Sequence, residues 1–178
     1  EDTLSWGIVM YSLTEDVYDY LEKILIQDNS TTYLDGQVIR KLILTSDNSI
    51  WAATNLGISR IDPKTFAVTN YRKHDFGTNS LSSDLVNDIV EDMNSNIWVA
   101  TEDGLNKLDP QTDEFKFLGE KNGLPTNNLK SIQVDNSGDL WVGSSNGVSK
   151  IEISVGYNNP IIINYDVKDG LQGYDFIP

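Results

Sequence analysis

One ten-residue pattern occurs three times in this chain and constrains the fold more than any other feature. It is SIWAATNLGI at residues 49–58, NIWVATEDGL at 96–105 and DLWVGSSNGV at 139–148. In every copy a glycine follows the tryptophan by six residues and a leucine precedes it by seventeen. Spacing shared over so long a stretch indicates internal repeats. The repeated positions hold Trp51, Trp98 and Trp141, then Gly57, Gly104 and Gly147, and also Leu34, Leu81 and Leu124.

The period of the repeat predicts the fold class. Trp98 follows Trp51 by 47 residues, Trp141 follows Trp98 by 43, and Trp6 precedes Trp51 by 45. Repeats of about 40 to 50 residues with several short strands are typical of β-propeller blades. We therefore predict an all-β protein, a β-propeller fragment of about four repeats of four-stranded antiparallel blades. The expected units are a partial divergent blade at 1–33, blades at 34–80, 81–123 and 124–170, and the first strand of a further blade at 171–178.

The first full unit shows how four strands fit into one blade. The predicted strands, with equivalents in the next two units, are Ile39 to Leu44, Ile50 to Ala53, Ile58 to Ile61 and Phe66 to Tyr71. Asp103-Gly104 and Asn146-Gly147 predict hairpins between second and third strands, with type I′ turns because these residues tolerate positive φ. Asp62-Pro63 and Asp109-Pro110 predict turns between third and fourth strands, where the missing N–H of proline does no harm.

Composition excludes several functional classes. The 178 residues include 13 Lys+Arg against 27 Asp+Glu, a formal charge of −14, with one His and no Cys. Without cysteine there can be no disulfide, zinc–thiolate site or cysteine nucleophile. The acidic excess argues against nucleic acid and anionic membranes, which are bound through Lys and Arg. No apolar stretch approaches the roughly 18 residues of a spanning helix, so we expect no direct membrane insertion by this segment.

The repeated residues resemble a known family. Their order, an apolar–Trp pair, small residues, Thr or Ser, two turn residues, Gly, apolar, basic, apolar and acid, is similar to the two-component regulator propeller repeat. That repeat is found in extracytoplasmic sensor regions of bacterial hybrid histidine kinases, notably of gut Bacteroidetes. The resemblance covers residues 34–171. The chain departs from the pattern in three ways. The usual glycine before the apolar–Trp pair appears only as Gly138, the usual glycine after Trp is replaced by Ala52-Ala53 or Val99-Ala100 in two units, and the unit of Trp6 lacks the Thr and Gly.

The resemblance implies a function in signalling. Such propellers belong to periplasmic receptors in which a small sandwich domain, a membrane helix and cytoplasmic kinase and receiver modules follow, and which are commonly tuned to oligosaccharides. These 178 residues contain none of those modules. We therefore expect a periplasmic, ligand-sensing segment of an inner-membrane two-component sensor that recognises an oligosaccharide or another small ligand.

Candidate ligand residues are predicted at positions that every repeat has but that hold a different type of residue in each repeat. In a propeller, the hairpins between second and third strands and the links between blades open on one face, and loops on such scaffolds commonly carry function. Polar groups at the mouth of the innermost strands could line a central channel. The candidates are Arg40, Asn87 and Lys130 on the innermost strands, Asn55, Asp103 and Asn146 in the hairpins, and Asn127 and Asn128 in a link.

Other conspicuous residues are expected to be structural. The recurring tryptophans have apolar neighbours at one strand position, which favours packing between blades over stacking on sugars. The recurring glycines are expected to form turns. The segment from Asp135 to Asp139 resembles part of a calcium loop but lacks the distal bidentate acid. Its equivalents in the other units look like plain turns, so we expect no metal and no cofactor.

An enzyme is the main alternative. A streptogramin-lyase-like propeller has similar tryptophan-rich blades and would need a general base, an acid and a magnesium-held substrate. His74 is the single imidazole, and no Ser-His-Asp order or phosphate loop is present. We therefore predict a binding module with no catalytic residues. A third class is a protein-interaction scaffold, in which the same face binds protein rather than sugar.

The positions at which the repeat units begin indicate whether these blades can close a ring. A unit begins 17 residues before its tryptophan, so the unit of Trp6 would begin before residue 1, while Leu171 to Ile177 resembles the first strand of another blade. Propellers have about 4 to 8 blades, and open sheet edges tend to pair. We expect an arc of a larger ring, with self-association through its open edges.

Overall fold

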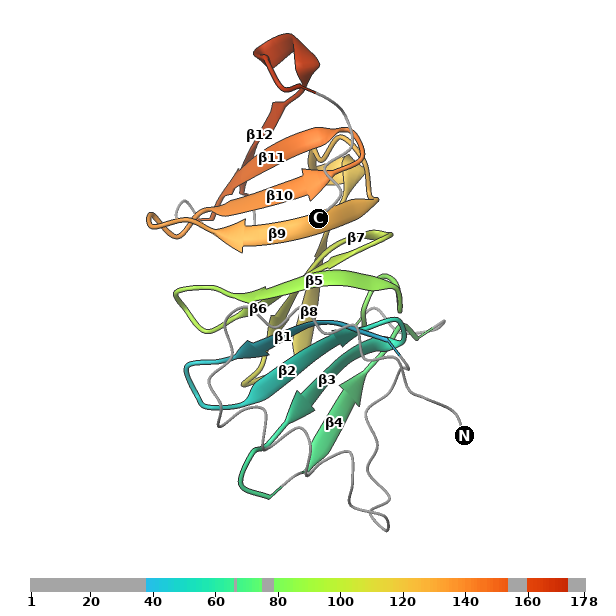
Figure 1. Ribbon diagram of the computed structural model, residues 1–178, viewed down its shortest axis with the longest axis vertical. Coiled ribbons are helices and arrows are strands. Elements are labelled where there is room, and N and C mark those ends of the chain that lie inside the picture. The colour runs from blue at the N-terminus through green and yellow to red at the C-terminus, as the bar shows by residue number, and fades with distance from the viewer. Residues whose placement is uncertain (1–37, 66, 75–78, 154–159, 173–178) are drawn as a thin grey trace.

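The computed structural model describes residues 38–65, 67–74, 79–153 and 160–172, which form three four-stranded antiparallel sheets (Figure 1). Blade 1 contains β1 (Ile39–Leu44), β2 (Ile50–Thr54), β3 (Gly57–Ile61) and β4 (Val68–Tyr71). Blade 2 contains β5 (Val86–Glu91), β6 (Ile97–Thr101), β7 (Gly104–Asp109) and β8 (Glu114–Leu118). Blade 3 contains β9 (Leu129–Val134), β10 (Leu140–Ser144), β11 (Gly147–Glu152) and β12 (Ile161–Tyr165). The predicted fold class is confirmed.

Within each blade the strands lie side by side in chain order. The first strands β1, β5 and β9 are neighbours across the blades, so the sheets fan out from this inner row (Figure 1). Two short 3-10 helices follow the outer strands, η1 (Glu120–Asn122) after blade 2 and η2 (Val167–Asp169) after blade 3. No helix among the described residues is long and apolar enough to span a membrane. The unit of Trp6, Leu34, Phe66 and most of the strand predicted at 171–177 lie outside the described residues.

Packing between blades explains the repeated tryptophans. Trp51 lies in a buried cluster with residues of blade 2, among them Leu81 and Ile89. Trp98 occupies the equivalent place against Leu124 and other residues of blade 3. Each sheet thus turns its tryptophan face toward the next blade, which accounts for the leucine seventeen residues before each tryptophan. Trp51 and Trp98 are each 1% exposed, as predicted. Trp141 is only partly buried, and no further blade packs on its sheet among the described residues.

The hairpins between second and third strands form where predicted, but not with the predicted turn type. A type I′ turn needs positive φ at both central residues. Gly104 (φ 105°) and Gly147 (φ 118°) are left-handed, whereas Asp103 and Asn146 are not among the described residues with positive φ. A hydroxyl shapes the loop instead. Thr101 Oγ1 accepts from the Asp103 N–H at 3.1 Å and donates to the Gly104 carbonyl at 2.9 Å, which is a local side-chain turn.

The turns between first and second strands explain an irregularity in the repeat. The residue three before the tryptophan is left-handed in all three blades: Asn48 (φ 65°), Ser95 (φ 61°) and Gly138 (φ 86°). Glycine adopts this conformation without strain and asparagine tolerates it. The family glycine is therefore a backbone requirement, which this chain meets with two other residues.

Candidate functional site

The candidates on the innermost strands connect neighbouring blades. Arg40 Nη1 donates to Asn87 Oδ1 at 2.9 Å, and Asn87 Nδ2 donates to the Leu129 carbonyl at 2.7 Å. One residue further along, Lys41 Nζ lies 2.6 Å from Asp88 Oδ1, and Asp88 Oδ2 accepts from a blade 3 backbone N–H at 2.8 Å. These polar groups hold three inner strands together. Lys130 stands at the equivalent place on β9, and its contact with a ligand stays a prediction.

The hairpin and link candidates are held by hydrogen bonds to nearby residues, and one bond joins two of them. Asn127 Nδ2 donates to Asp103 Oδ1 at 3.3 Å, and the Asn146 amide donates to the Pro125 carbonyl at 3.2 Å. Asn55 Oδ1 accepts from the Val38 N–H at 3.1 Å. The Asn128 backbone N–H bonds to a threonine hydroxyl, while its Oδ1 is buried without a hydrogen-bond partner. One of these bonds, from Asn127 to Asp103, joins the link before blade 3 to the hairpin of blade 2. A role of the four asparagines and Asp103 in ligand binding stays a prediction.

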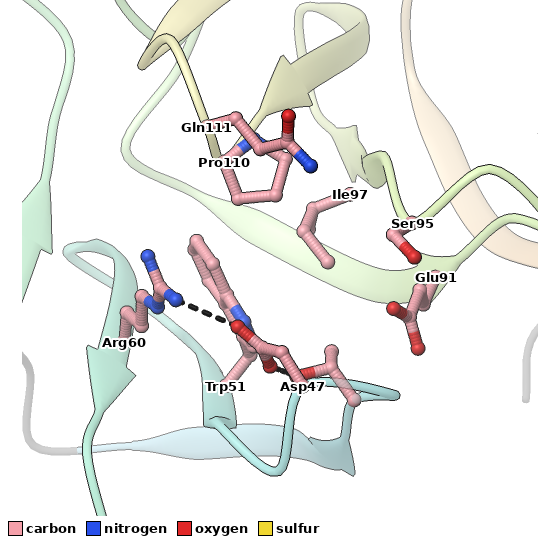
Figure 2. A pocket seen from close by; sticks show the side chains of 9 residues that line it. Asp47, Trp51, Arg60, Glu91, Ser95, Ile97, Pro110 and Gln111 are labelled. Atoms are coloured by element: carbon pink, nitrogen blue, oxygen red, sulfur yellow. Dashed lines mark hydrogen bonds and ion pairs between the residues drawn. The ribbon is translucent and has the colours of Figure 1, made fainter.

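A pocket that the sequence did not reveal opens between blades 1 and 2, at the other end of the strands from these hairpins. Its volume is about 140 Å³. Blade 1 contributes the β1–β2 turn and part of β2 and β3, and blade 2 contributes the β5–β6 and β7–β8 turns (Figure 2). The lining residues are Thr45, Asp47, Trp51, Arg60, Glu91, Ser95, Ile97, Pro110 and Gln111.

Two changes in the repeat lie at this pocket. In blades 2 and 3 an aspartate stands six residues before the tryptophan and accepts its indole N–H: Asp92 from Trp98 at 2.8 Å and Asp135 from Trp141 at 2.9 Å. In blade 1 that position is Thr45, whose hydroxyl bonds to Asp47 Oδ1 at 2.6 Å and to a backbone carbonyl. Thr45 is shorter than the aspartate of the other blades, and the carboxylate of blade 1 stands two residues later, at Asp47. Together these changes leave space beside the Trp51 indole.

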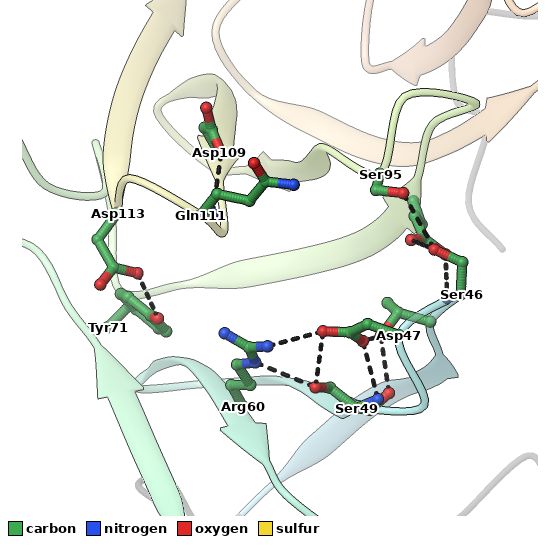
Figure 3. Close-up of polar contacts among 11 residues, drawn as sticks. Ser46, Asp47, Ser49, Arg60, Tyr71, Ser95, Asp109, Gln111 and Asp113 are labelled. Carbon is green, nitrogen blue, oxygen red and sulfur yellow. Dashed lines mark hydrogen bonds and ion pairs between the residues drawn. The ribbon is translucent and has the colours of Figure 1, made fainter.

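The moved carboxylate organises the blade 1 wall of the pocket (Figure 3). Asp47 Oδ2 accepts from Arg60 Nη2 at 2.7 Å, and Arg60 Nε donates to the Ser49 hydroxyl at 3.1 Å. The guanidinium carbon lies 5.7 Å from the Trp51 ring centroid, a cation–π contact. Burial raises the pKa of Asp47, but hydrogen bonds from Thr45 and Ser49 and the charge of Arg60 outweigh it, so the pKa of this carboxyl is lowered. Asp47 is therefore ionised at neutral pH.

Glu91 and Ser95 form the blade 2 wall and are tied to blade 1. Ser46 donates from its backbone N–H to Glu91 Oε2 at 2.8 Å and from its hydroxyl to Glu91 Oε1 at 2.6 Å. The Ser46 hydroxyl also lies 3.0 Å from Ser95 Oγ. Gln111 completes this wall from the β7–β8 turn, where its backbone N–H donates to Asp109 at 2.9 Å (Figure 3). The side chains of Glu91, Arg60 and Asp47 are therefore held in place before any ligand enters.

The aromatic faces at this site are already covered. Tyr71 stacks on Trp51 with ring centroids 5.6 Å apart, and Arg60 lies over the same indole. The Tyr71 hydroxyl donates to Asp113 Oδ1 at 2.8 Å across the blades. Burial, assisted by that bond, raises the pKa of Tyr71 to about 12. Trp51 therefore lines the pocket without offering a free face for stacking, in agreement with its predicted packing role.

Two signals in the sequence could have indicated this pocket. Thr45 replaces an aspartate that the other two units share, and Asp47 appears two positions later. Arg60 stands where the other units have Lys107 and Lys150. Among the described residues, no group of three or more His, Asp or Glu side chains is placed to hold a metal ion. His74, the single imidazole, is exposed.

Sequence comparison identifies the repeat. Residues 80–103 and 123–146 match the family described as two component regulator propeller, and they include Trp98 and Trp141 with their hairpins. The predicted repeat family is confirmed by this match. No curated protein matches the chain by sequence.

Solved structures confirm the propeller fold. The extracellular domain of a protein described as a hybrid two-component system of B. thetaiotaomicron has 20% identity and a TM-score of 0.67 over 78% of this chain. Virginiamycin B lyase from Staphylococcus aureus, solved with quinupristin, has 19% identity and a TM-score of 0.51 over 72%. PorZ, a surface component of the type-IX secretion system of Porphyromonas gingivalis, has 20% identity and a TM-score of 0.53 over 62%. The chain spans 19%, 41% and 17% of the lengths of these proteins. Its blades have the propeller fold of these proteins, and two of its repeats match the two-component regulator propeller.

Proposed function

We propose that this chain is an extracytoplasmic, periplasmic ligand-sensing segment of a two-component sensor, and that it contributes to recognition of an oligosaccharide whose binding is signalled to a kinase. The observation that carries the proposal is the match of two successive repeats to the two-component regulator propeller, in blades whose loops present many amide and carboxylate groups. Planar polar groups of this kind suit hydroxyl-rich ligands, since each hydroxyl both donates and accepts hydrogen bonds.

Calorimetric titration tests the proposal. The complete extracytoplasmic region that contains this chain is titrated with a panel of oligosaccharides that differ in sugar, linkage and charge. We expect saturable binding of one class of oligosaccharide. If every member of the panel fails to bind, the proposal is wrong.

Two controls separate the proposal from its alternatives. Magnesium-dependent turnover of a cyclic depsipeptide substrate, lost in His74→Ala, would indicate a lyase instead of a sensor. Binding of a protein partner without any oligosaccharide binding would indicate an interaction scaffold. The proposal of a non-catalytic oligosaccharide sensor predicts that neither result is obtained.

A further inference from the structure

We propose that the pocket between blades 1 and 2 binds a single neutral sugar ring and discriminates against acidic saccharides. The inference rests on the proposed function, because it assumes that the ligand is a saccharide. It adds a location, between the β1–β2 turn and the β5–β6 and β7–β8 turns, and a chemical class.

The size of the pocket limits the ligand to one ring. Pockets for drug-sized ligands measure roughly 300 to 1,000 Å³, and the volume here is about 140 Å³. That space is several times the roughly 30 Å³ that one water occupies in the liquid. One ring of an oligosaccharide can enter, and the remainder of the chain would extend into solvent.

The charges in the pocket favour a neutral ligand. Asp47 and Glu91 supply two carboxylates, and Arg60, the single cation among the lining residues, is already paired with Asp47 at 2.7 Å. A uronate or sulfate would meet this excess of negative charge inside a protein of net charge −14. A hydroxyl can donate to Glu91 and accept from Arg60 or the Gln111 amide, so a neutral polyol satisfies both kinds of group.

The pocket is also organised for polar rather than stacking contacts. Ser46 fixes Glu91 through two bonds, and Ser49 and Asp47 fix Arg60 through two more. Side chains held in this way lose little entropy when a ligand binds. Trp51 is 1% exposed, so its indole edge borders the ligand while its faces stay in the blade interface (Figure 2).

The equivalent positions at the next interface lack this arrangement. Asp92 occupies the place of Thr45 and accepts the Trp98 indole N–H, and Val134 takes the place of Glu91. Changing blade 1 toward this pattern gives a matched test of the proposal. The double variant Thr45→Asp with Asp47→Asn gives the blade 1 turn the two residues that blade 2 has as Asp92 and Asn94.

The experiment follows the Trp51 indole N–H signal by NMR in the 178-residue chain. Neutral tetrasaccharides of glucose, xylose and mannose, tetragalacturonate and a heparin-derived tetrasaccharide are added at millimolar concentration. We expect at least one neutral tetrasaccharide to shift the Trp51 signal and not the Trp98 signal, and the acidic ones to shift neither. Glu91→Gln should weaken that binding about tenfold, since it removes a charged acceptor. The double variant should abolish it.

Glu114→Gln is the control for the loss of one charge, because Glu114 is exposed on β8 of the same blade, outside the pocket. It should bind as the unmodified chain does. The inference is overturned if the acidic tetrasaccharides shift the Trp51 signal, if Glu91→Gln and Glu114→Gln behave alike, or if no saccharide shifts it. The proposed function fails separately, when the complete extracytoplasmic region binds no oligosaccharide at all.

Discussion

The two blade–blade interfaces use the same positions of the repeat for different purposes. Between blades 2 and 3, Asp92 accepts the Trp98 indole N–H and Lys107 is only 9% exposed, and burial lowers the pKa of this lysine. Between blades 1 and 2, Thr45 replaces the aspartate, and the Arg60 side chain is 31% exposed beside a pocket. A repeat scaffold can therefore convert a structural turn into a candidate site by moving one carboxylate along the chain.

The contact between successive turns differs in the same way. Met93 of the blade 2 turn lies against Gly138 of the blade 3 turn, where an added Cβ would come within 3.2 Å of the sulfur. At the equivalent contact of blade 1 with blade 2, Ser46 bonds to Glu91 and Ser95. A methionine side chain meets the next turn at one interface, and hydrogen bonds link the turns at the other. The predictions below test whether this division holds, beginning with the largest effect.

Removing Trp98 should destabilise the protein most. Trp98 is 1% exposed and bonded to Asp92, and truncation of a buried tryptophan to alanine costs about 3 to 5 kcal/mol. Trp141→Ala, at a partly buried equivalent position, should cost less. Urea unfolding, with the midpoint and slope fitted for each variant, measures both losses. Equal losses would show that the position in the repeat, and not burial by the next blade, sets the contribution.

Asp88→Ala should have the next largest effect, because one carboxylate joins three blades. Asp88 contacts Lys41 at 2.6 Å and accepts from the Ile132 N–H at 2.8 Å. Loss of a partly buried carboxylate that bonds to both a charged group and a backbone N–H costs about 1 to 3 kcal/mol. Asp103→Ala is the control, since Asp103 is about half exposed and lies 3.9 Å from Lys73. It should change the free energy of unfolding by about 0 to 1 kcal/mol, and a similar loss in both variants would contradict the linking role of Asp88.

The hairpin glycines should respond unequally to alanine. Gly57 (φ 101°) would place a Cβ 2.2 Å from the Tyr71 carbonyl oxygen, which belongs to the backbone and cannot move without distorting β4. Gly104 (φ 105°) would place it against the Phe117 ring, which is 47% exposed and can swing away. We expect Gly57→Ala to cost about 2 kcal/mol and Gly104→Ala about 1 kcal/mol. Thermal unfolding followed by near-ultraviolet circular dichroism compares the two, and the reverse order would refute the explanation.

The sequence predicts contacts within a blade better than contacts between blades. Strand positions follow from alternation and turn residues, so β1 is found at the predicted bounds of Ile39–Leu44. The tryptophans at equivalent positions of the repeat are also predicted to be buried. An apolar residue that recurs in every blade packs against the next blade, which repeats too. The type I′ prediction failed because residue identity permits several turns, and the hydroxyl of Thr101 favours another one.

Contacts between blades depend on the rotation of one sheet against the next, which spacing along the chain does not determine. Arg40 and Asn87 occupy equivalent positions in successive repeats, yet that equivalence does not predict the hydrogen bond between their side chains. The pocket is a stronger case. Its lining residues come from three turns and four strands that span residues 45 to 111. In the sequence, the exchange at Thr45 and Asp47 and the arginine at position 60 are the marks of this pocket.

The smallest expected effect concerns acid, and it compares the carboxylates of blades 3 and 1. A hydrogen bond from the Trp141 indole, with backbone N–H donors of Asp139 and Ser137, lowers the pKa of Asp135 below its usual 3.8. A carboxyl whose folded pKa is depressed stabilises the fold above its unfolded pKa, and that contribution is lost as the pH falls through the folded value.

Asp135→Asn keeps an oxygen that can accept the indole N–H but cannot ionise, so the variant lacks this titration. The difference in unfolding free energy between the unmodified chain and Asp135→Asn should therefore be constant from about pH 7 to pH 5 and shrink below about pH 4. Asp47→Asn should behave in the same direction, because the pKa of Asp47 is also lowered. Urea titrations at several pH values measure both differences. A difference for Asp135→Asn that is independent of pH would mean that the indole bond does not depend on the charge of the carboxylate. The aspartate-to-threonine change in blade 1 would then matter through its shape alone.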